Sequence, residues 1–273
     1  MAENLGSRLL PAFDTATGIP NPRVRLDGGA VHTSDSTDTT IASATSLILE
    51  FGTLSQLTGN DTYIRLAREA TESVWKMRNN ITGRVPQTTM YKPYQMVPIA
   101  RLIFCGARIK GLFPIGVDAS NYEITNPMAG IGAGMDSFME YLLKSYIMFG
   151  RDLDFSRFHQ LMSSMKKYAR QGRSKCFSGE GHVPFYVNVN HENGNVENNW
   201  IDSLGAFFPG LLTLSGDIEE AVCLHFLYFT IWRMFDAIPE RYNWKMLQPE
   251  VMFYPLRPEL IESTYHLYRI VIT

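Results

Sequence analysis

Residues 132–145 read G-A-G-M-D-S-F-M-E-Y-L-L-K-S and predict a helix that begins near Asp136. Asp136 and Glu140 are four residues apart, so their carboxylates lie on one face of that helix. Two carboxylates among aromatic residues are unusual on a helix that packs in a core. The alternative is a solvated helix end, in which the acidic first turn suits the helix dipole and Glu140 pairs with Lys144.

Residues 254–268, Y-P-L-R-P-E-L-I-E-S-T-Y-H-L-Y, show the same combination of carboxylates and aromatic rings. Pro258 stands where the first position of a helix tolerates proline. Glu259, Glu262 and His266 then fall on one helical face. Two helices of this kind can bring carboxylates together across a pocket, which is the arrangement that glycoside hydrolysis requires.

Three long motifs, in the same order along the chain, carry a family resemblance. They are the two stretches above and R-L-L-P-A-F-D-T-A-T-G-I-P at 8–20. With them the chain resembles glycoside hydrolase family 47, the class I α-1,2-mannosidases. W-I-D-S-L-G-A-F-F-P-G at 200–210 and P-E-R-Y-N-W at 239–244 resemble one branch, the endoplasmic-reticulum degradation-enhancing α-mannosidase-like proteins.

The resemblance implies an all-α fold, a barrel of seven helix pairs, (α/α)7, with small β-hairpins. Residues 1–273 are expected to supply a partial barrel, as a family 47 catalytic domain truncated at both ends. By the same resemblance, Asp136 is a catalytic carboxylate, Glu259 is the general base and Arg257 faces the sugar. Substrate-binding positions are also implied for four acidic residues: Glu50, Asp202, Glu140 and Glu262. The last two remain open to the simpler interpretation as solvated helix charges.

The implied activity is inverting α-1,2-mannosidase-type hydrolysis of high-mannose N-glycans on misfolded glycoproteins, in the lumen of the endoplasmic reticulum. Calcium (Ca2+) is the implied cofactor. The threonine that binds it is expected beyond Thr273, so no metal ligand is assigned within this chain. A further acidic group, a glutamate, is expected upstream of residue 1, and we therefore expect these 273 residues alone to release no mannose. A glycan-binding protein without turnover and a truncated product without function remain alternatives.

Two positions depart from the pattern of the processing enzymes in this family. Gly134 stands where those mannosidases carry arginine, and Ser203 stands where they carry histidine. Both exchanges fit the degradation-enhancing branch. They leave the trimming specificity open.

The composition is that of a globular protein, with 45% hydrophobic and 19% charged residues. A net charge of −2 gives no indication of nucleic-acid binding. The longest apolar stretch, residues 221–232, is too short to span a bilayer. The N-terminus, M-A-E-N-L-G-S-R, has no apolar signal core, so we expect the natural N-terminus to lie upstream.

A pattern of helix, glycine, polar residue and helix occurs three times, at Gly59, Gly150 and Gly216. The spacings of 91 and 66 residues differ. Residues 84–110 have five basic residues, three prolines and no acidic residue, and without these 27 residues the first spacing becomes 64. We expect 84–110 to be a non-family insertion outside the packed helices; the alternative is a genuine basic surface loop. Helices are expected over 62–77, 136–148, 155–169, 202–214 and 218–235.

Cysteines and glycosylation motifs predict little by themselves. Cys105, Cys176 and Cys223 form an odd set without metal-binding spacing. The sequons N-D-T at 60–62 and N-I-T at 80–82 matter only in a secretory compartment, and such short motifs often arise by chance.

Two further expectations concern packing. H-V-P-F-Y-V-N-V at 182–189 has the β-branched and aromatic character of a hairpin strand. The stripe of Phe226, Phe229, Trp232 and Phe235 on the helix expected at 218–235 is predicted to pack against neighbouring helices rather than to bind sugar.

Overall fold

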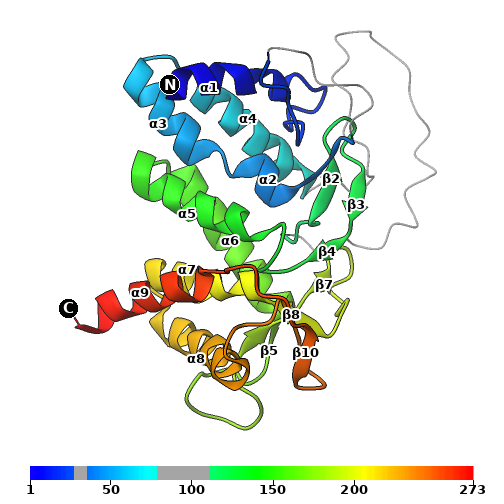
Figure 1. Cartoon of the computed structure of the whole chain (residues 1–273), viewed down its shortest axis with the longest axis vertical. Coiled ribbons are helices and arrows are strands. Elements are labelled where there is room, and N and C mark those ends of the chain that lie inside the picture. Colours follow the sequence, from blue (N-terminus) through cyan, green and yellow to red (C-terminus); the bar gives the residue numbers. More distant parts are fainter. Residues whose placement is uncertain (28–35, 79–110, 273) are drawn as a thin grey trace, which may run out of the picture.

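The computed structural model describes residues 1–27, 36–78 and 111–272. Helices dominate these ranges, and the short strands lie along one side of the helical layers (Figure 1). The expected insertion at 84–110 and the sequon at 80–82 lie outside the described residues. Within those ranges, no helix has both the length and the apolar character needed to cross a membrane.

Helix pairs form the body of the molecule, as the repeated glycine pattern predicts. The pairs are α3 (Ile48–Thr58) with α4 (Thr62–Met77), α5 (Asp136–Phe149) with α6 (Asp152–Tyr168), and α7 (Phe208–Leu214) with α8 (Ile218–Phe235). We call the first helix of each pair the inner helix. We also count α9 (Glu259–Ile272) as an inner helix, because it follows a strand as the others do and packs on α7 and α8. Helix α1 (Ala2–Leu9) packs on α3, and α2 (Ile41–Thr45) packs on α4 and α5.

Each inner helix of a pair ends next to a glycine in the left-handed conformation. The φ angles are +73° at Gly59, +68° at Gly150 and +86° at Gly216. The backbone N–H groups of Gly59 and Gly150 close the last helical turns on Ser55 and Tyr146, at 2.9 and 2.8 Å. A Cβ at any of the three glycines meets no atom within 4 Å. Glycine is therefore needed for the backbone conformation and not for space.

The strands form small antiparallel sheets. One sheet joins β1 (Asp38–Thr40), β2 (Gly116–Asp118) and β3 (Ile124–Asn126), and another joins β8 (Trp200–Asp202), β9 (Arg241–Asn243) and β10 (Gln248–Val251). The predicted strand at 182–189 is divided into two short strands with different partners. β6 (Phe185–Tyr186) pairs with β5 (Arg170–Gln171), whereas β7 (Val189–Asn190) pairs with β4 (Met128–Ala129).

The strands stand at the end of the molecule where the inner helices begin. In chain order, β1 leads into α2 and α3, β4 leads into α5, and β10 leads into α9. β8 leads into the 3-10 helix η2 (Ser203–Phe207) and then α7. Because short turns make consecutive helices antiparallel, each outer helix returns the chain to the same end. The fold therefore brings the N-termini of the inner helices to one side of the molecule, near the strands (Figure 1).

Aromatic rings fill the core between the first two helix pairs. Phe113 packs edge-on against Phe138 of α5 with ring centroids 5.2 Å apart, and Trp75 of α4 lies 5.4 Å from Phe113. Phe113 and Phe138 are almost completely inaccessible to solvent. Burial of such rings contributes about 1.5–3 kcal/mol each.

Three of the four residues in the aromatic stripe on α8 differ from the prediction, whereas Phe235 packs against the core as expected. Phe226, Phe229 and Trp232 are 60%, 39% and 42% exposed. The helix turns its opposite face, with Leu224 and Tyr228, into the core. These three residues therefore form a surface of the described chain, and the sequence did not show which of the two apolar faces of α8 is buried.

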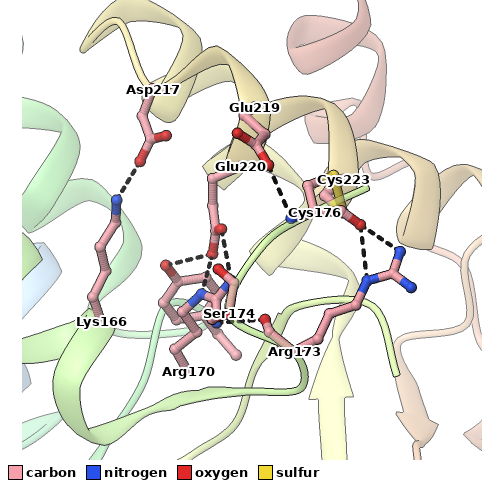
Figure 2. Close-up of polar contacts among 10 residues, drawn as sticks. Lys166, Arg170, Arg173, Ser174, Cys176, Asp217, Glu219, Glu220 and Cys223 are labelled. Atoms are coloured by element: carbon pink, nitrogen blue, oxygen red, sulfur yellow. Dashed lines mark hydrogen bonds and ion pairs between the residues drawn. A yellow bond between two sulfur atoms is a disulfide. The ribbon is translucent and has the colours of Figure 1, made fainter. Parts of the chain in front are cut away.

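A disulfide joins Cys176, in the loop after β5, to Cys223 on α8 (Figure 2). Its neighbours form a polar cluster with the same helix. Arg170 donates two hydrogen bonds to the carboxylate of Glu220, at 2.6 and 3.0 Å, and Glu219 accepts one from the Cys176 backbone N–H at 3.0 Å. The odd set of cysteines predicted no bridge, because the pairing depends on a Cα–Cα distance of 5.5 Å that only the fold creates.

Removing this bridge should destabilise the chain. The two cysteines are 47 residues apart, and a cross-link of that span restricts the unfolded chain by about 2–4 kcal/mol. We expect the double variant Cys176→Ser, Cys223→Ser to lose that much in urea unfolding. Parent protein measured in reductant should lose the same amount. A reduced parent as stable as the oxidised one would contradict the prediction.

A second prediction concerns the left-handed turns. Gly150→Ala should destabilise the chain by about 1–2 kcal/mol, because a Cβ in this conformation crowds the following carbonyl oxygen. Gly150→Asn is the matched control and should lose less, since asparagine enters the left-handed region more readily. Urea unfolding followed by circular dichroism gives both values. An alanine variant with the stability of the parent would show that the turn does not need this conformation.

Candidate active site

Three carboxyl groups lie where inner helices begin. Asp136 is the first residue of α5, Glu259 is the first residue of α9, and Asp202 caps η2 ahead of α7. Helices α5 and α9 both pack against η2, so the three groups lie close together. Burial is the main cause that raises the pKa values of Asp202 and Glu259, and the negative charge of Asp136 adds to both increases. Positions that are far apart in the sequence therefore meet in one site.

Asp202 is held by backbone groups on both sides. It accepts hydrogen bonds from the N–H of Gly205 at 3.1 Å and from the N–H of Ala133 at 3.4 Å. Burial raises its pKa to about 6 although these bonds act in the opposite direction, and the charge of Asp136 adds to the increase. A Cβ at Gly132 would lie 2.1 Å from the carboxylate, so only glycine allows this approach.

Asp136 is partly buried, and this burial raises its pKa. Its Oδ1 accepts hydrogen bonds from the Ser137 N–H at 2.8 Å and the Ser137 hydroxyl at 3.3 Å, which favour the ionised form. Glu140 acts in the other direction as a like charge, and Arg257 favours ionisation. The net effect is a carboxyl group that holds its proton to a higher pH than an exposed aspartate.

Glu259 has a raised pKa, mainly because of burial, while the positive charge of Arg257 favours its ionised form. Its Oε2 is enclosed and accepts no hydrogen bond from the described residues. A buried carboxylate oxygen without a partner is costly unless a ligand or a water molecule supplies a donor.

Arg257 is fixed by a residue that the sequence analysis did not select, Glu240. Arg257 donates from Nε to Glu240 Oε2 at 3.0 Å and from Nη2 to Oε1 at 2.5 Å. Ser203 donates to the same Oε2 at 3.0 Å. The hydrogen bond from Arg257 is the main cause of a lowered pKa of Glu240, and the hydrogen bond from Ser203 acts in the same direction. The only sequence signal for Glu240 is its position in the motif P-E-R-Y-N-W at 239–244. That motif supports the family resemblance but does not indicate a role for this residue.

The remaining predicted residues link neighbouring inner helices. Tyr141 on α5 donates a hydrogen bond to Glu50 on α3 at 2.7 Å. Glu140 pairs with Lys144, whose Nζ also lies 3.6 Å from Glu262 on α9. The side chains of Lys144 and Glu140 are only 30% and 19% exposed, so this is a partly buried bridge and not a solvated pair. The fold thus connects Glu50, Glu140 and Glu262 to the helices that carry the three carboxyl groups.

A metal shell is not formed by these side chains. Across residues 1–27, 36–78 and 111–272, no three histidine, cysteine, aspartate or glutamate side chains converge on a point that could hold a metal ion. Calcium requires six to eight oxygen ligands. The described residues do not supply such a shell by themselves.

Sequence comparison assigns the chain that carries these residues to a family. The sequence model of glycosyl hydrolase family 47 matches residues 1–272. The chain belongs to this family.

Two relatives illustrate the similarity and its extent along the chain. The "ER degradation-enhancing alpha-mannosidase-like protein 1" of Schizosaccharomyces pombe is 38% identical over 269 residues, which cover 98% of this chain and 29% of that protein. The "Alpha-mannosidase I MNS5" of Arabidopsis thaliana is 35% identical over 271 residues, which cover 98% of this chain and 40% of that protein. The chain thus spans well under half the length of these relatives.

The fold also matches a solved structure. The α-1,2-mannosidase from Trichoderma reesei aligns with a TM-score of 0.73 at 22% sequence identity, over 98% of this chain and 55% of that one. This likeness confirms the predicted all-α barrel of helix pairs, of which the chain forms a part.

The raised pKa of Asp202 predicts a pH-dependent stability. Its folded value of about 6 lies above the ordinary 3.8, so the folded state binds more protons between these values. Stability from this group therefore decreases as the pH rises through that window. Asp202→Asn cannot ionise, so its stability relative to the parent should improve from pH 4 to pH 7 by up to about 3 kcal/mol.

Urea unfolding at several pH values measures this difference. Asp38→Asn, at an exposed carboxyl group, is the matched control and should show a much smaller change with pH. A difference between Asp202→Asn and the parent that stays constant from pH 4 to pH 7 would contradict the assignment of a raised pKa.

Proposed function

We propose that this chain carries part of the active site of an inverting α-1,2-mannosidase-type glycoside hydrolase. The observation that supports it is the meeting of Asp136, Asp202 and Glu259 beside Arg257. Inverting hydrolysis needs one carboxylic acid to protonate the leaving oxygen and one carboxylate to activate water on the opposite face of the sugar. Neighbouring carboxyl groups with different surroundings can divide these two roles.

Glu259 is the proposed general base. Burial raises the pKa of Glu259, and the positive charge of Arg257 opposes this increase and favours the carboxylate that a base requires. Glu259 Oε2 accepts no hydrogen bond from the described residues, so the acceptor capacity of this oxygen is unused. The match of R-P-E to the family motif supports the same role.

Asp136 is the proposed second catalytic carboxyl group. Burial and the nearby charge of Glu140 raise its pKa, which suits a group that retains a proton for the leaving oxygen. Asp202 and Arg257 are proposed to contact the sugar, and Glu50, Glu140 and Glu262 are proposed to line or support the pocket. Calcium is proposed as the cofactor of the complete family domain.

High-mannose N-glycans of misfolded glycoproteins are the proposed substrates, in the lumen of the endoplasmic reticulum. Support comes from the relatives that are named as endoplasmic-reticulum degradation-enhancing proteins. The disulfide between Cys176 and Cys223 adds support, because such bonds persist in oxidising compartments.

The test uses the protein at its full natural length. Asp136→Asn and Glu259→Gln preserve shape and remove one acidic group each, so each should reduce mannose release by roughly 10²–10⁴-fold. Binding of the glycan should persist. Glu69→Gln, at an exposed carboxyl group on α4, is the control and should leave the rate unchanged.

The assay is the release of free mannose from a purified high-mannose glycan. Variants at Asp136 and Glu259 that hydrolyse at the parent rate would show that these residues are not catalytic. A parent protein that binds the glycan and never releases mannose would favour the alternative of a glycan-binding protein.

A further inference from the structure

The sequon at 60–62 occupies the exposed turn between α3 and α4. Asn60 follows the left-handed Gly59, and its side chain is exposed. Its Oδ1 accepts a hydrogen bond from the backbone N–H of Thr62 at 3.0 Å. This local turn holds the carboxamide at the tip of the loop. Its Nδ2 donates no hydrogen bond within the described part of the chain.

A second, independent observation concerns the compartment in which the chain matures. The bridge between Cys176 and Cys223 requires oxidising surroundings, such as those of the secretory route. Asn-X-Thr motifs are modified on chains that enter this route. From the sequence alone, neither the cysteines nor the sequon indicate a compartment. The disulfide in the structure indicates an oxidising compartment, in which the sequon can be modified.

We propose that Asn60 is an N-glycosylation site. In this step the Asn60 amide nitrogen forms a bond to the anomeric carbon of an oligosaccharide that is carried on a lipid diphosphate. The bond from that carbon to the diphosphate oxygen breaks, the lipid diphosphate leaves, and the amide nitrogen releases one proton. The product is a neutral N-glycosyl amide, and no oxidant or reductant is involved.

The position of Asn60 is compatible with a bulky glycan. Glu50 lies in the first turn of α3, and Asn60 follows the last turn of this 11-residue helix, which is about 16 Å long. The proposed active site stands at the other end of the inner helices, near Asp136 and Glu259. No atom lies within 4 Å of a Cβ placed on Gly59, so the turn is open to solvent. A glycan here leaves the carboxyl groups accessible.

The experiment is production of the chain behind a cleavable secretion leader in eukaryotic cells. Enzymatic removal of N-glycans in ¹⁸O-labelled water converts each glycosylated asparagine to labelled aspartate, which peptide mass spectrometry locates. We expect the label at position 60. Asn80→Gln removes the other sequon, and this variant should still lose one glycan in its intact mass. Thr62→Ala should abolish the label, whereas the matched control Thr62→Ser should retain it.

The result that overturns the proposal is an unlabelled position 60 in chains that have demonstrably entered the compartment. Entry is shown by the Cys176–Cys223 bridge or by a label at Asn80. Because the modification is read on a peptide, a variant that folds poorly still gives an answer. The outcome is independent of hydrolytic activity, so it neither supports nor weakens the proposed function.

Discussion

The direction of the inner helices is the constraint on which the site depends. Left-handed glycines at 59, 150 and 216 end these helices and allow the chain to reverse into the outer helices within a few residues. Every inner helix therefore starts on the side of the strands. The backbone N–H groups at those starts are electropositive and tolerate carboxylates. A set of acidic residues that would repel one another elsewhere can be gathered there.

Much of the fold follows from local signals in the sequence. The bounds of α4, α5 and α8 lie within one residue of the predicted ranges, because glycine and polar residues mark the turns beside them. The strand at 182–189 was less predictable, since its two halves pair with segments from different parts of the chain. The same reason applies to the bridge at Cys223, whose partner is chosen by tertiary contact.

The site could be predicted only where a motif carries it. Asp136 and Glu259 stand in long stretches that resemble a family, and both lie at helix starts in the structure. Glu240 carries no periodic or spacing signal, and its role depends on Arg257, 17 residues away. The raised pKa of Asp202 was equally hidden, because it arises from burial against the backbone at Gly132.

The bond between Arg257 and Glu240 also has a consequence for recognition. An arginine side chain carries about 2 kcal/mol of rotamer entropy when it is free. Here two hydrogen bonds from Arg257 to Glu240, and one from Ser203 to the same carboxylate, fix the guanidinium during folding, so in the proposed site the cation is already oriented before a ligand arrives. Two of its five N–H donors are occupied, which restricts the directions from which a hydroxyl group can approach. Preorganisation of this kind lowers the entropy cost of binding.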